Sequence, residues 1–338
     1  MTRSEPLVSV VTPMLNEQSH LAECVESILA QTYDKWELVI VDNCSVDKSL
    51  AIAKSYAAKD KRIRVVECQQ RIPALPNHNR ALQQISSASR YCKVVFADDL
   101  IVPECLAKMV DVAEQYPSVG IVGAYGLEGD RVVWTGIPYP VRIVAGRELC
   151  RRLFLDGLYV FGTATSLLYR TEVVRQTRPF FIEDHVHGDS EACVVALKTW
   201  DFGFVHQVLT ISQLRRGSLR TQSEDIGTYC AGKLRELVAH GSAFLTPEEY
   251  KRCLKKSVAQ YYGNLGGGLL RMRGADYWKY HIDQLGASGV SFSKCRLGAV
   301  VLAKLCAGVL NPGVAISKAY RIGKEMLVRK LSTATANS

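Results

Sequence analysis

The sequence predicts an α/β protein with a mixed, mainly parallel sheet flanked by helices, followed by a helical C-terminal extension. Three observations predict this fold class. In the first hundred residues, short runs rich in Val and Ile alternate with stretches of helical periodicity. The apolar runs are continuous, as in parallel strands that helices cover on both faces. From about residue 226 onward only the helical periodicity continues.

Four strands and three helices are expected in the first hundred residues. The strands are 7–13, 36–42, 63–68 and 91–99, and the helices between them are 17–31, 45–59 and 78–89. The first helix places Leu21, Val25 and Ile28 at helical spacing. The second opens with Ser45 and Asp47, two residue types that cap helix N-termini. In such sheets, ligands bind beyond the carboxyl ends of the strands.

The rest of the chain mixes element types before it becomes helical. We expect a helix over 105–116, two strands around a glycine-rich turn over 119–136, a helix over 146–157, a strand, turn and helix over 163–175, and a loop, helix and strand over 180–205. We place a first domain at 1–225 and a helical region at 226–338. Within that region, Thr246 and Glu249 form a capping box that predicts a helix start.

Composition restricts the protein class without naming a partner. The 338 residues are 48% apolar and 22% charged, which is ample for a large core. A formal net charge of +9 favours an anionic partner such as a nucleotide or a lipid headgroup. No nucleic-acid-binding motif is present, so we expect no nucleic-acid partner. The eleven cysteines form no CxxC pair and no secretory pattern precedes them, which favours buried thiols and a cytoplasmic location.

The C-terminal region combines an apolar segment, 297–310, with many flanking lysines and arginines. Lys304 interrupts this segment, which is short for a membrane span. Three hypotheses remain open: a helix that packs on the catalytic domain, an interfacial helix on an anionic membrane surface, and a true span.

Acidic residues follow several of the predicted strands. Glu17, Asp42, and the adjacent pair Asp98 and Asp99 would meet at one edge of the sheet. Two carboxylates in one cleft repel each other unless a cation joins them, and Mg²⁺ or Mn²⁺ suits oxygen ligands. Such an ion often binds substrate phosphates as well. The pattern therefore suggests a site for a nucleoside diphosphate.

The segment 7–50 resembles the opening of a family 2 glycosyltransferase with the GT-A fold, a Rossmann-like architecture. The similarity lies in the strand that ends in Pro13, the Asn16-Glu17 pair, the helix with "ESILAQTY", and "ELVIVDNCSVD". It extends over roughly residues 7–210. "ADDLIVPECL" resembles the acidic metal-binding motif of that family, although Ala97 replaces the aspartate that would lie two residues before Asp99.

The resemblance implies roles for individual residues. A base and ribose pocket would contain Thr12, Pro13, Glu17 and Asp42, with Asp42 near the nucleobase and Glu17 near the ribose hydroxyls. Asn79 matches a family position near the nucleotide. Asp98 would contact the ribose or the sugar, and Asp99 would hold the metal. Neither of the common glycine-rich phosphate-loop motifs is present.

An inverting sugar transfer needs a base that accepts the acceptor hydroxyl proton. The register of the resemblance makes Asp189 this base, with Asp184 as the rival and a helix cap as the alternative role of Asp189. A metal cluster at His185 and His187 is the weaker hypothesis, because no third ligand matches.

Three further features have two interpretations each: the Arg215-Arg216 segment, Trp134 and Trp200. Arg215 and Arg216 would bind diphosphate oxygens or belong to a solvated basic loop. Trp134 and Trp200 would be core residues or an acceptor platform, and the sequence does not separate the two.

The resemblance implies an inverting hexosyltransferase that moves a sugar from a nucleoside-diphosphate sugar to a saccharide or lipid-linked acceptor, in surface polysaccharide synthesis, in the cytoplasm and at the inner face of the cell membrane. The alternative is a non-catalytic relative that binds the nucleotide sugar.

Overall fold

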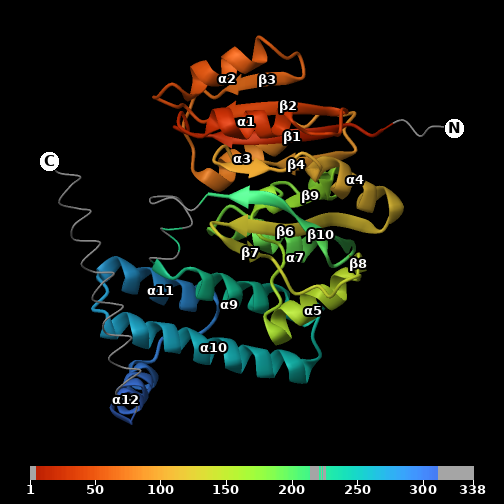
Figure 1. The fold of residues 1–338 in the computed structure, drawn as a ribbon. Coiled ribbons are helices and arrows are strands. Elements are labelled where there is room, and N and C mark those ends of the chain that lie inside the picture. Colours follow the sequence, from red (N-terminus) through yellow and green to blue (C-terminus); the bar gives the residue numbers. More distant parts are fainter. Residues whose placement is uncertain (1–4, 214–220, 222, 224–225, 311–338) are drawn as a thin grey trace. The chain divides into compact units, whose positions relative to one another are not determined.

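The computed structural model describes residues 5–213, 221, 223 and 226–310. The chain divides into two compact units, Met1–Leu254 and Lys255–Ser338, which are described one at a time. The first contains a mixed, mainly parallel sheet flanked by helices and the second is helical, so the predicted fold class is confirmed (Figure 1). The boundary after residue 225 stays a prediction.

Ten strands of the described chain form one sheet. They are β1 (Val8–Met14), β2 (Trp36–Asp42), β3 (Ile63–Glu67), β4 (Tyr91–Val94), β5 (Asp99–Ile101), β6 (Val119–Glu128), β7 (Arg131–Val133), β8 (Ile143–Val144), β9 (Leu167–Arg170) and β10 (Asp201–Ser212). Their order is β3-β2-β1-β4-β9-β6-β10-β5, with β7 on β6 and β8 on β10.

The strand directions bring several strand ends to one edge. β1, β2, β3 and β4 are parallel, and so are β6 and β10. β9 is antiparallel to both β4 and β6, so β4 and β6 run the same way. The carboxyl ends of β1, β2, β4, β6 and β10 therefore share one edge, on the left in Figure 1.

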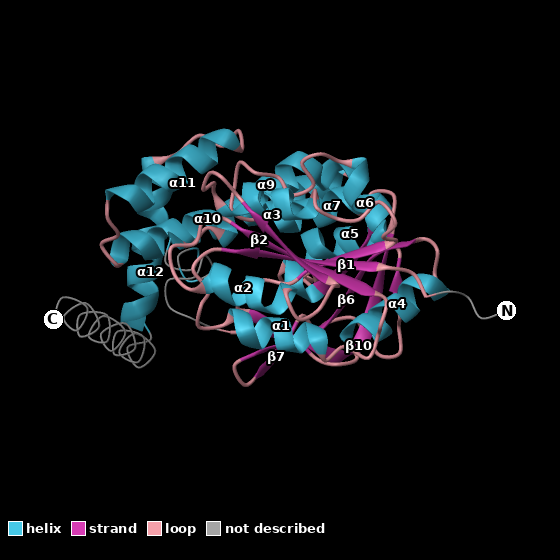
Figure 2. Ribbon diagram, turned by 90° about the horizontal axis from the view of Figure 1, so that it is seen from above, coloured by secondary structure: helices cyan, strands magenta, loops and turns pink. Residues whose placement is uncertain are grey.

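Helices cover both faces of this sheet (Figure 2). α1 (Leu21–Leu29), α2 (Ser49–Ala57) and α4 (Cys105–Gln115) pack on one face. α3 (Ala74–Leu82), α5 (Gly146–Asp156), α6 (Thr171–Gln176) and α7 (Gly188–Ala196) pack on the other, and the unit also contains the 3₁₀ turn η1 (Ala164–Ser166), α9 (Tyr229–His240) and η2 (Gly241–Ala243). Successive residues of β1 enter opposite cores, Val10 on the first face and Val11 on the second.

Two of the predicted elements are wrong in their bounds. The third helix is α3, Ala74–Leu82, and not 78–89. Pro73 and Pro76 are tolerated there because the first helical turn needs no backbone donors. The segment after α3 is not helical, since the Ser86 N–H donates to the side chains of Ser9 and Glu37 instead of a helical carbonyl.

The predicted strand 91–99 is also divided. β4 ends at Val94 and β5 begins at Asp99, with four residues between them. This break turns the chain at the point where the two aspartates occur.

The second unit begins inside a long helix. α10 runs from Pro247 to Leu270, followed by α11 (Ala275–Ala287) and α12 (Lys294–Leu310). The predicted capping box is present: the Glu249 N–H donates to Thr246 Oγ1 at 3.2 Å, and the Thr246 N–H donates to Glu249 Oε2 at 3.1 Å. Among the residues in view, no helix has the length and apolarity that crossing a bilayer requires. All eleven cysteines are free thiols, and six are buried.

Candidate functional site

The predicted nucleotide residues gather at the carboxyl edge of the sheet. Thr12 and Pro13 come just before Met14, the last residue of β1; Pro13 pairs with Val41, and Asp42 ends β2. Glu17 follows β1 in the loop before α1, and it is 8% exposed. Asp42 is 3% exposed, and both of its carboxylate oxygens lie 3.2 Å from the Ser45 N–H. These four residues therefore line adjacent strand ends.

A buried thiol marks the point where the acids converge. The pKa of Cys24 in α1 is raised, first by burial and then by the carboxylates of Asp99, Asp98 and Glu17. The Cys24 Sγ also lies 3.5 Å from the Phe96 carbonyl, beside the break between β4 and β5. The turn that carries Asp98 and Asp99 therefore lies beside α1, the helix that follows Glu17. The sequence offered no signal for Cys24, which occurs as an ordinary apolar position of an amphipathic helix.

Asp99 is the most buried of the predicted metal-binding acids. It is 5% exposed, and burial together with the neighbouring Asp98 raises its pKa to about 7. Hydrogen bonds from Thr165 and Ser212 and the charge of Lys93 act in the opposite direction. Burial, the largest of these effects, favours the neutral form of this carboxyl.

Lys93 supplies the cation beneath this site. It lies on β4 with no exposed surface, and its Nζ donates to the carbonyls of Thr165 at 2.6 Å and Leu167 at 3.3 Å. Burial lowers its pKa. The Thr165 Oγ1 in turn accepts a hydrogen bond from the Phe96 N–H at 3.1 Å. Lys93 therefore holds η1 against the turn that carries both aspartates.

A divalent cation fits this acidic turn in part. Asp98 and Asp99 are adjacent in this turn, and carboxylate oxygens are the ligands such ions prefer. Across the described ranges no group of three His, Cys, Asp or Glu side chains could hold a metal, so substrate phosphates and water would supply the other ligands. Ala97 lies two residues before Asp99, and it is 2% exposed. The acid that the family motif would carry is therefore missing.

Side chains join the loop after β1 to the loop after β2. Asn16 Oδ1 accepts from the Val46 N–H at 2.8 Å, and the Asn16 N–H donates to Ser45 Oγ at 3.0 Å. The Glu17 N–H donates to Ser49 Oγ at 2.7 Å. Asn16 has a left-handed backbone with φ +56°, a conformation that asparagine tolerates. The two loops that carry Glu17 and follow Asp42 are thus connected by hydrogen bonds.

Asn79 is buried, and its side chain connects α3 to the segment around Phe181. Its Nδ2 donates to the Phe181 carbonyl at 2.7 Å and to Glu183 Oε1 at 2.8 Å, and its Oδ1 accepts from the Phe181 N–H at 2.9 Å. The amide pairs with both backbone groups of one residue. It anchors the segment that leads to α7, while its predicted contact with the nucleotide stays a prediction.

The predicted base lies in the first turn of α7. Asp189 is half-buried, and burial raises the pKa of its carboxyl. Its Oδ1 accepts from the Ser190 N–H at 2.8 Å. A carboxylate with a raised pKa is a stronger proton acceptor than a free aspartate, as general base catalysis requires. The rival, Asp184, has a side chain that is 62% exposed and pairs with Arg235 at 2.7 Å.

A buried ion network lies behind Asp189, between α7 and α9. Glu191 Oε2 lies 2.6 Å from His185 Nε2, and Glu191 Oε1 lies 2.8 Å from His240 Nε2. These hydrogen bonds outweigh burial and lower the pKa of Glu191. His187 is engaged elsewhere, with Nε2 2.9 Å from Thr228 Oγ1. The two histidines thus have different partners.

Burial raises the pKa of the neighbouring Glu236 to about 8. The sequence gave no signal for Glu236, which comes next to the base helix only through the packing of α9. Arg215 and Arg216 lie outside the described residues.

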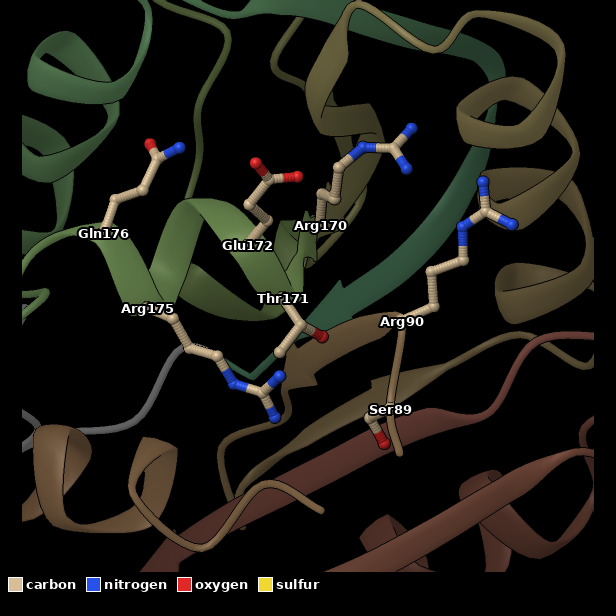
Figure 3. Close-up of a pocket in the computed structure, with 7 residues that line it drawn as sticks. All are labelled: Ser89, Arg90, Arg170, Thr171, Glu172, Arg175 and Gln176. Carbon is tan, nitrogen blue, oxygen red and sulfur yellow. The ribbon is translucent and has the colours of Figure 1, made fainter. Parts of the chain in front are cut away.

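The structure contains a pocket of about 550 Å³ elsewhere on the first unit (Figure 3). Its lining residues are Ser89, Arg90, Arg170, Thr171, Glu172, Arg175 and Gln176. They lie where β4 begins and β9 ends, so the pocket opens at the amino edge of the parallel strands. The Arg170 Nε and Nη2 donate to the carbonyls of Val119 and Ala113, and Arg175 donates to Ser86. These arginines connect structural elements, and the pocket is not the nucleotide site.

Comparisons with known proteins agree with this geometry. The model of the family "Glycosyl transferase family 2" matches residues 9–178, half of the chain. EpsE of Bacillus subtilis (strain 168), whose name describes a glycosyltransferase, is 32% identical over 185 residues, which are 52% of this chain and 63% of EpsE. The chain thus spans less than two thirds of that relative.

Two solved structures share the fold. TarS residues 1–349 of Staphylococcus aureus, in complex with UDP-GlcNAc, matches with a TM-score of 0.63 and 18% identity, over 88% of each chain. The mannosyltransferase PcManGT of Pyrobaculum calidifontis, with GDP-Man and Mn²⁺, matches with a TM-score of 0.55 and 16% identity, over 91% of this chain and 81% of that one. At these identities the likeness concerns the fold.

Proposed function

Because the chain belongs to glycosyl transferase family 2, we propose that it is an inverting glycosyltransferase of the hexosyltransferase type. It moves a sugar from a nucleoside-diphosphate sugar to a hydroxyl of a saccharide or lipid-linked acceptor. The meeting of the chain segments that carry Glu17, Asp42 and the Asp98-Asp99 pair at one edge of the sheet is the observation that carries this proposal. TarS with UDP-GlcNAc and PcManGT with GDP-Man, both similar in fold, support a nucleotide-sugar donor.

The residues divide into a donor group and a base. Thr12, Pro13, Glu17 and Asp42 hold the nucleoside at the ends of β1 and β2. Asp189 accepts the proton of the acceptor hydroxyl while the hydroxyl oxygen forms a bond to the anomeric carbon. The bond from that carbon to the diphosphate breaks, and the nucleoside diphosphate leaves with the electron pair. Attack opposite the leaving group inverts the configuration of the sugar.

We propose Mg²⁺ or Mn²⁺ at Asp99, with Asp98 at the ribose or the sugar. A bound divalent ion neutralises the charge that develops on the leaving diphosphate. The adjacent carboxyl groups of Asp98 and Asp99 in the turn before β5 support such an ion, as does the Mn²⁺ bound by PcManGT. Lys93 and Thr165 keep the acidic turn in position whether or not the ion is bound.

The acceptor is proposed to belong to surface polysaccharide synthesis at the cytoplasmic face of the membrane. TarS, which is 24% identical over 253 residues, is named as a poly(ribitol-phosphate) β-N-acetylglucosaminyltransferase. The α12 helix exposes Leu302 and Leu305, with Lys304 between them. This pattern supports contact with an anionic lipid surface. Flotation with anionic vesicles but not with neutral vesicles is the expected result, and equal flotation with both would contradict it.

Calorimetric titration with UDP, GDP, CDP and dTDP, with and without Mn²⁺, tests the proposed donor site. One nucleotide should bind at least tenfold more tightly with Mn²⁺ than without it, and Asp99→Asn should abolish this difference. Asp111→Asn is the matched control, because Asp111 lies on α4 and forms a surface ion pair with Arg142. If no nucleotide binds with Mn²⁺ present, the proposed function is wrong.

A second candidate is a non-catalytic relative that binds the nucleotide sugar. The observation that favours it is Ala97, a buried apolar residue at the position of the missing acid, two residues before Asp99. Incubation with the sugar form of the bound nucleotide separates the two candidates. A transferase releases the nucleoside diphosphate, by transfer or by slow hydrolysis, whereas the non-catalytic relative leaves the donor intact.

A further inference from the structure

Trp134 has an unusual backbone conformation next to the candidate site. It directly follows β7, which pairs with the last residues of β6 at the carboxyl edge of the sheet. Its φ of +63° falls in the left-handed region, which a bulky side chain rarely adopts. Such a conformation persists only where the surrounding structure enforces it, and it is most common at functional sites.

Two glycines make room for the indole of Trp134. A Cβ atom on Gly126 would lie 2.7 Å from Trp134 Nε1, and a Cβ atom on Gly162 would lie 2.9 Å from the same atom. Both distances are shorter than any real contact, so a side chain at either position would displace the indole. The ring of Tyr159 meets that of Trp134 edge to face, with centroids 5.8 Å apart. The indole is therefore fixed in position while Trp134 stays half-buried.

The segment 159–166 connects this indole to both halves of the candidate site. The Tyr159 hydroxyl donates to the Gly162 carbonyl at 3.0 Å, and the Tyr159 ring packs against the core cluster that includes Ala192 and Cys193 of α7. At the other end of the segment, Thr165 Oγ1 accepts from the Phe96 N–H at 3.1 Å, in the turn that leads to Asp99. Trp134 thus lies beside a segment that is connected to the turn of the proposed metal acid and shares a core with the helix of the proposed base.

Shielded hydroxyls lie next to the same indole. Ser166 is 1% exposed, and its Oγ has no hydrogen-bond partner. A Cβ atom on Gly162 would lie 2.5 Å from this oxygen and 2.9 Å from Trp134 Nε1. Ser166 Oγ and the indole nitrogen thus lie on the same side of Gly162. The Thr163 Oγ1 also has no partner. Buried hydroxyls normally have partners, so a ligand with hydroxyl groups of its own would satisfy these two.

We propose that Trp134 is the platform on which a pyranose ring of the acceptor binds. This inference rests on the proposed transferase function and names its acceptor class. The C–H face of a pyranose is apolar and packs on the face of an aromatic ring, while its hydroxyls take polar partners. The ring is assigned to the acceptor because Tyr159, the aromatic partner of Trp134, packs in the same core as the helix that carries the base. An open-chain polyol phosphate, like the acceptor in the name of TarS, has no such face.

Trp200 provides an internal contrast. Its Nε1 donates to Gln176 at 3.2 Å, and its ring fills the space beside Gly120 at the beginning of β6. The guanidinium of Arg170 lies 5.9 Å from the same ring. Trp200 therefore lies at the amino edge of the sheet, whereas Asp98 and Asp99 lie at the carboxyl edge. The two residues that the sequence leaves equivalent thus have different surroundings.

Saturation-transfer NMR with defined probes tests the platform. The probes are methyl β-glucopyranoside, methyl β-N-acetylglucosaminide and ribitol 5-phosphate, each added to the full chain with Mg²⁺ and the nucleotide that binds. For at least one pyranoside, the ring C–H protons should receive the strongest saturation. Trp134→Ala should reduce this signal at least fivefold, Trp134→Phe should retain more than half of it, and Trp200→Phe should leave it unchanged.

Several results would overturn the platform. They are the absence of a pyranoside signal in the wild type, a pyranoside signal that Trp134→Ala leaves unchanged, and binding of ribitol 5-phosphate that depends on Trp134. Nucleotide affinity, measured by calorimetry on each variant, verifies that the donor site is folded and separates the two proposals. If nucleotide binding persists without a Trp134-dependent sugar signal, only the acceptor inference fails.

Discussion

Replacement of Asn79 by alanine tests whether this residue acts as an anchor for the base segment. The change removes three hydrogen bonds and leaves the N–H and the carbonyl of Phe181, a fully buried residue, without these partners. An unsatisfied buried polar group costs about 1–3 kcal/mol, so we expect a loss of roughly 2–5 kcal/mol in the free energy of unfolding. For an ordinary domain this is a large fraction of the total stability.

Asn77→Ala is the matched control. Asn77 lies on the same helix and is equally buried at 4% exposed, but its Oδ1 has no hydrogen-bond partner. Urea unfolding of both variants measures the difference, which should be at least about 1.5 kcal/mol. A loss no greater in Asn79→Ala than in Asn77→Ala would refute the anchor. If stability is unchanged and nucleotide affinity falls, the role that the family resemblance implies for Asn79 is the correct one.

Three other predictions concern charged groups. Asp189→Asn should lower kcat by about 10²–10⁴ with unchanged nucleotide affinity, while Asp184→Asn should have little effect. Steady-state rates measure both variants, and similar losses in the two would contradict the assignment of Asp189 as the base. Burial favours the neutral carboxyl of Glu236, so the folded chain keeps a proton that the unfolded chain loses above its usual pKa of 4.5, and stability should fall as pH rises from there to about 8. Glu236→Gln should remove up to about 1.4 kcal/mol per pH unit of that slope in urea unfolding, and an unaltered slope would refute it. Lys93→Met leaves two buried carbonyls without their donor and should cost roughly 2–4 kcal/mol by the same assay, whereas a neutral effect would show that η1 does not depend on it.

Local patterns predicted most of the fold. β2 begins at Trp36 and ends at Asp42 as expected, because a continuous apolar run has clear ends. α5 and the β6–β7 hairpin also follow the predicted ranges closely. The bounds of α3 were wrong because prolines in a first helical turn resemble helix breakers in sequence.

Of the candidate site, only the acids at the strand ends could be predicted from the sequence. Parallel topology alone indicates that Glu17, Asp42 and Asp99 lie at one edge. The contacts of Asn79 with Phe181, and of Glu191 with His240, join residues tens of positions apart through side chains. No periodicity encodes such contacts. The distinction between Trp134 and Trp200 depended likewise on which glycines lie opposite each indole.

The hydrogen bonds between the loops after β1 and β2 have a consequence for engineered chimeras. Val46 depends on the side chain of Asn16, and Glu17 depends on that of Ser49, so neither loop keeps its conformation without the other. A chimera that takes only one of these loops from a relative with a different nucleobase preference would lose hydrogen-bond partners in both loops. The two loops are a single unit of exchange, and specificity for the nucleobase would have to be transplanted as a pair.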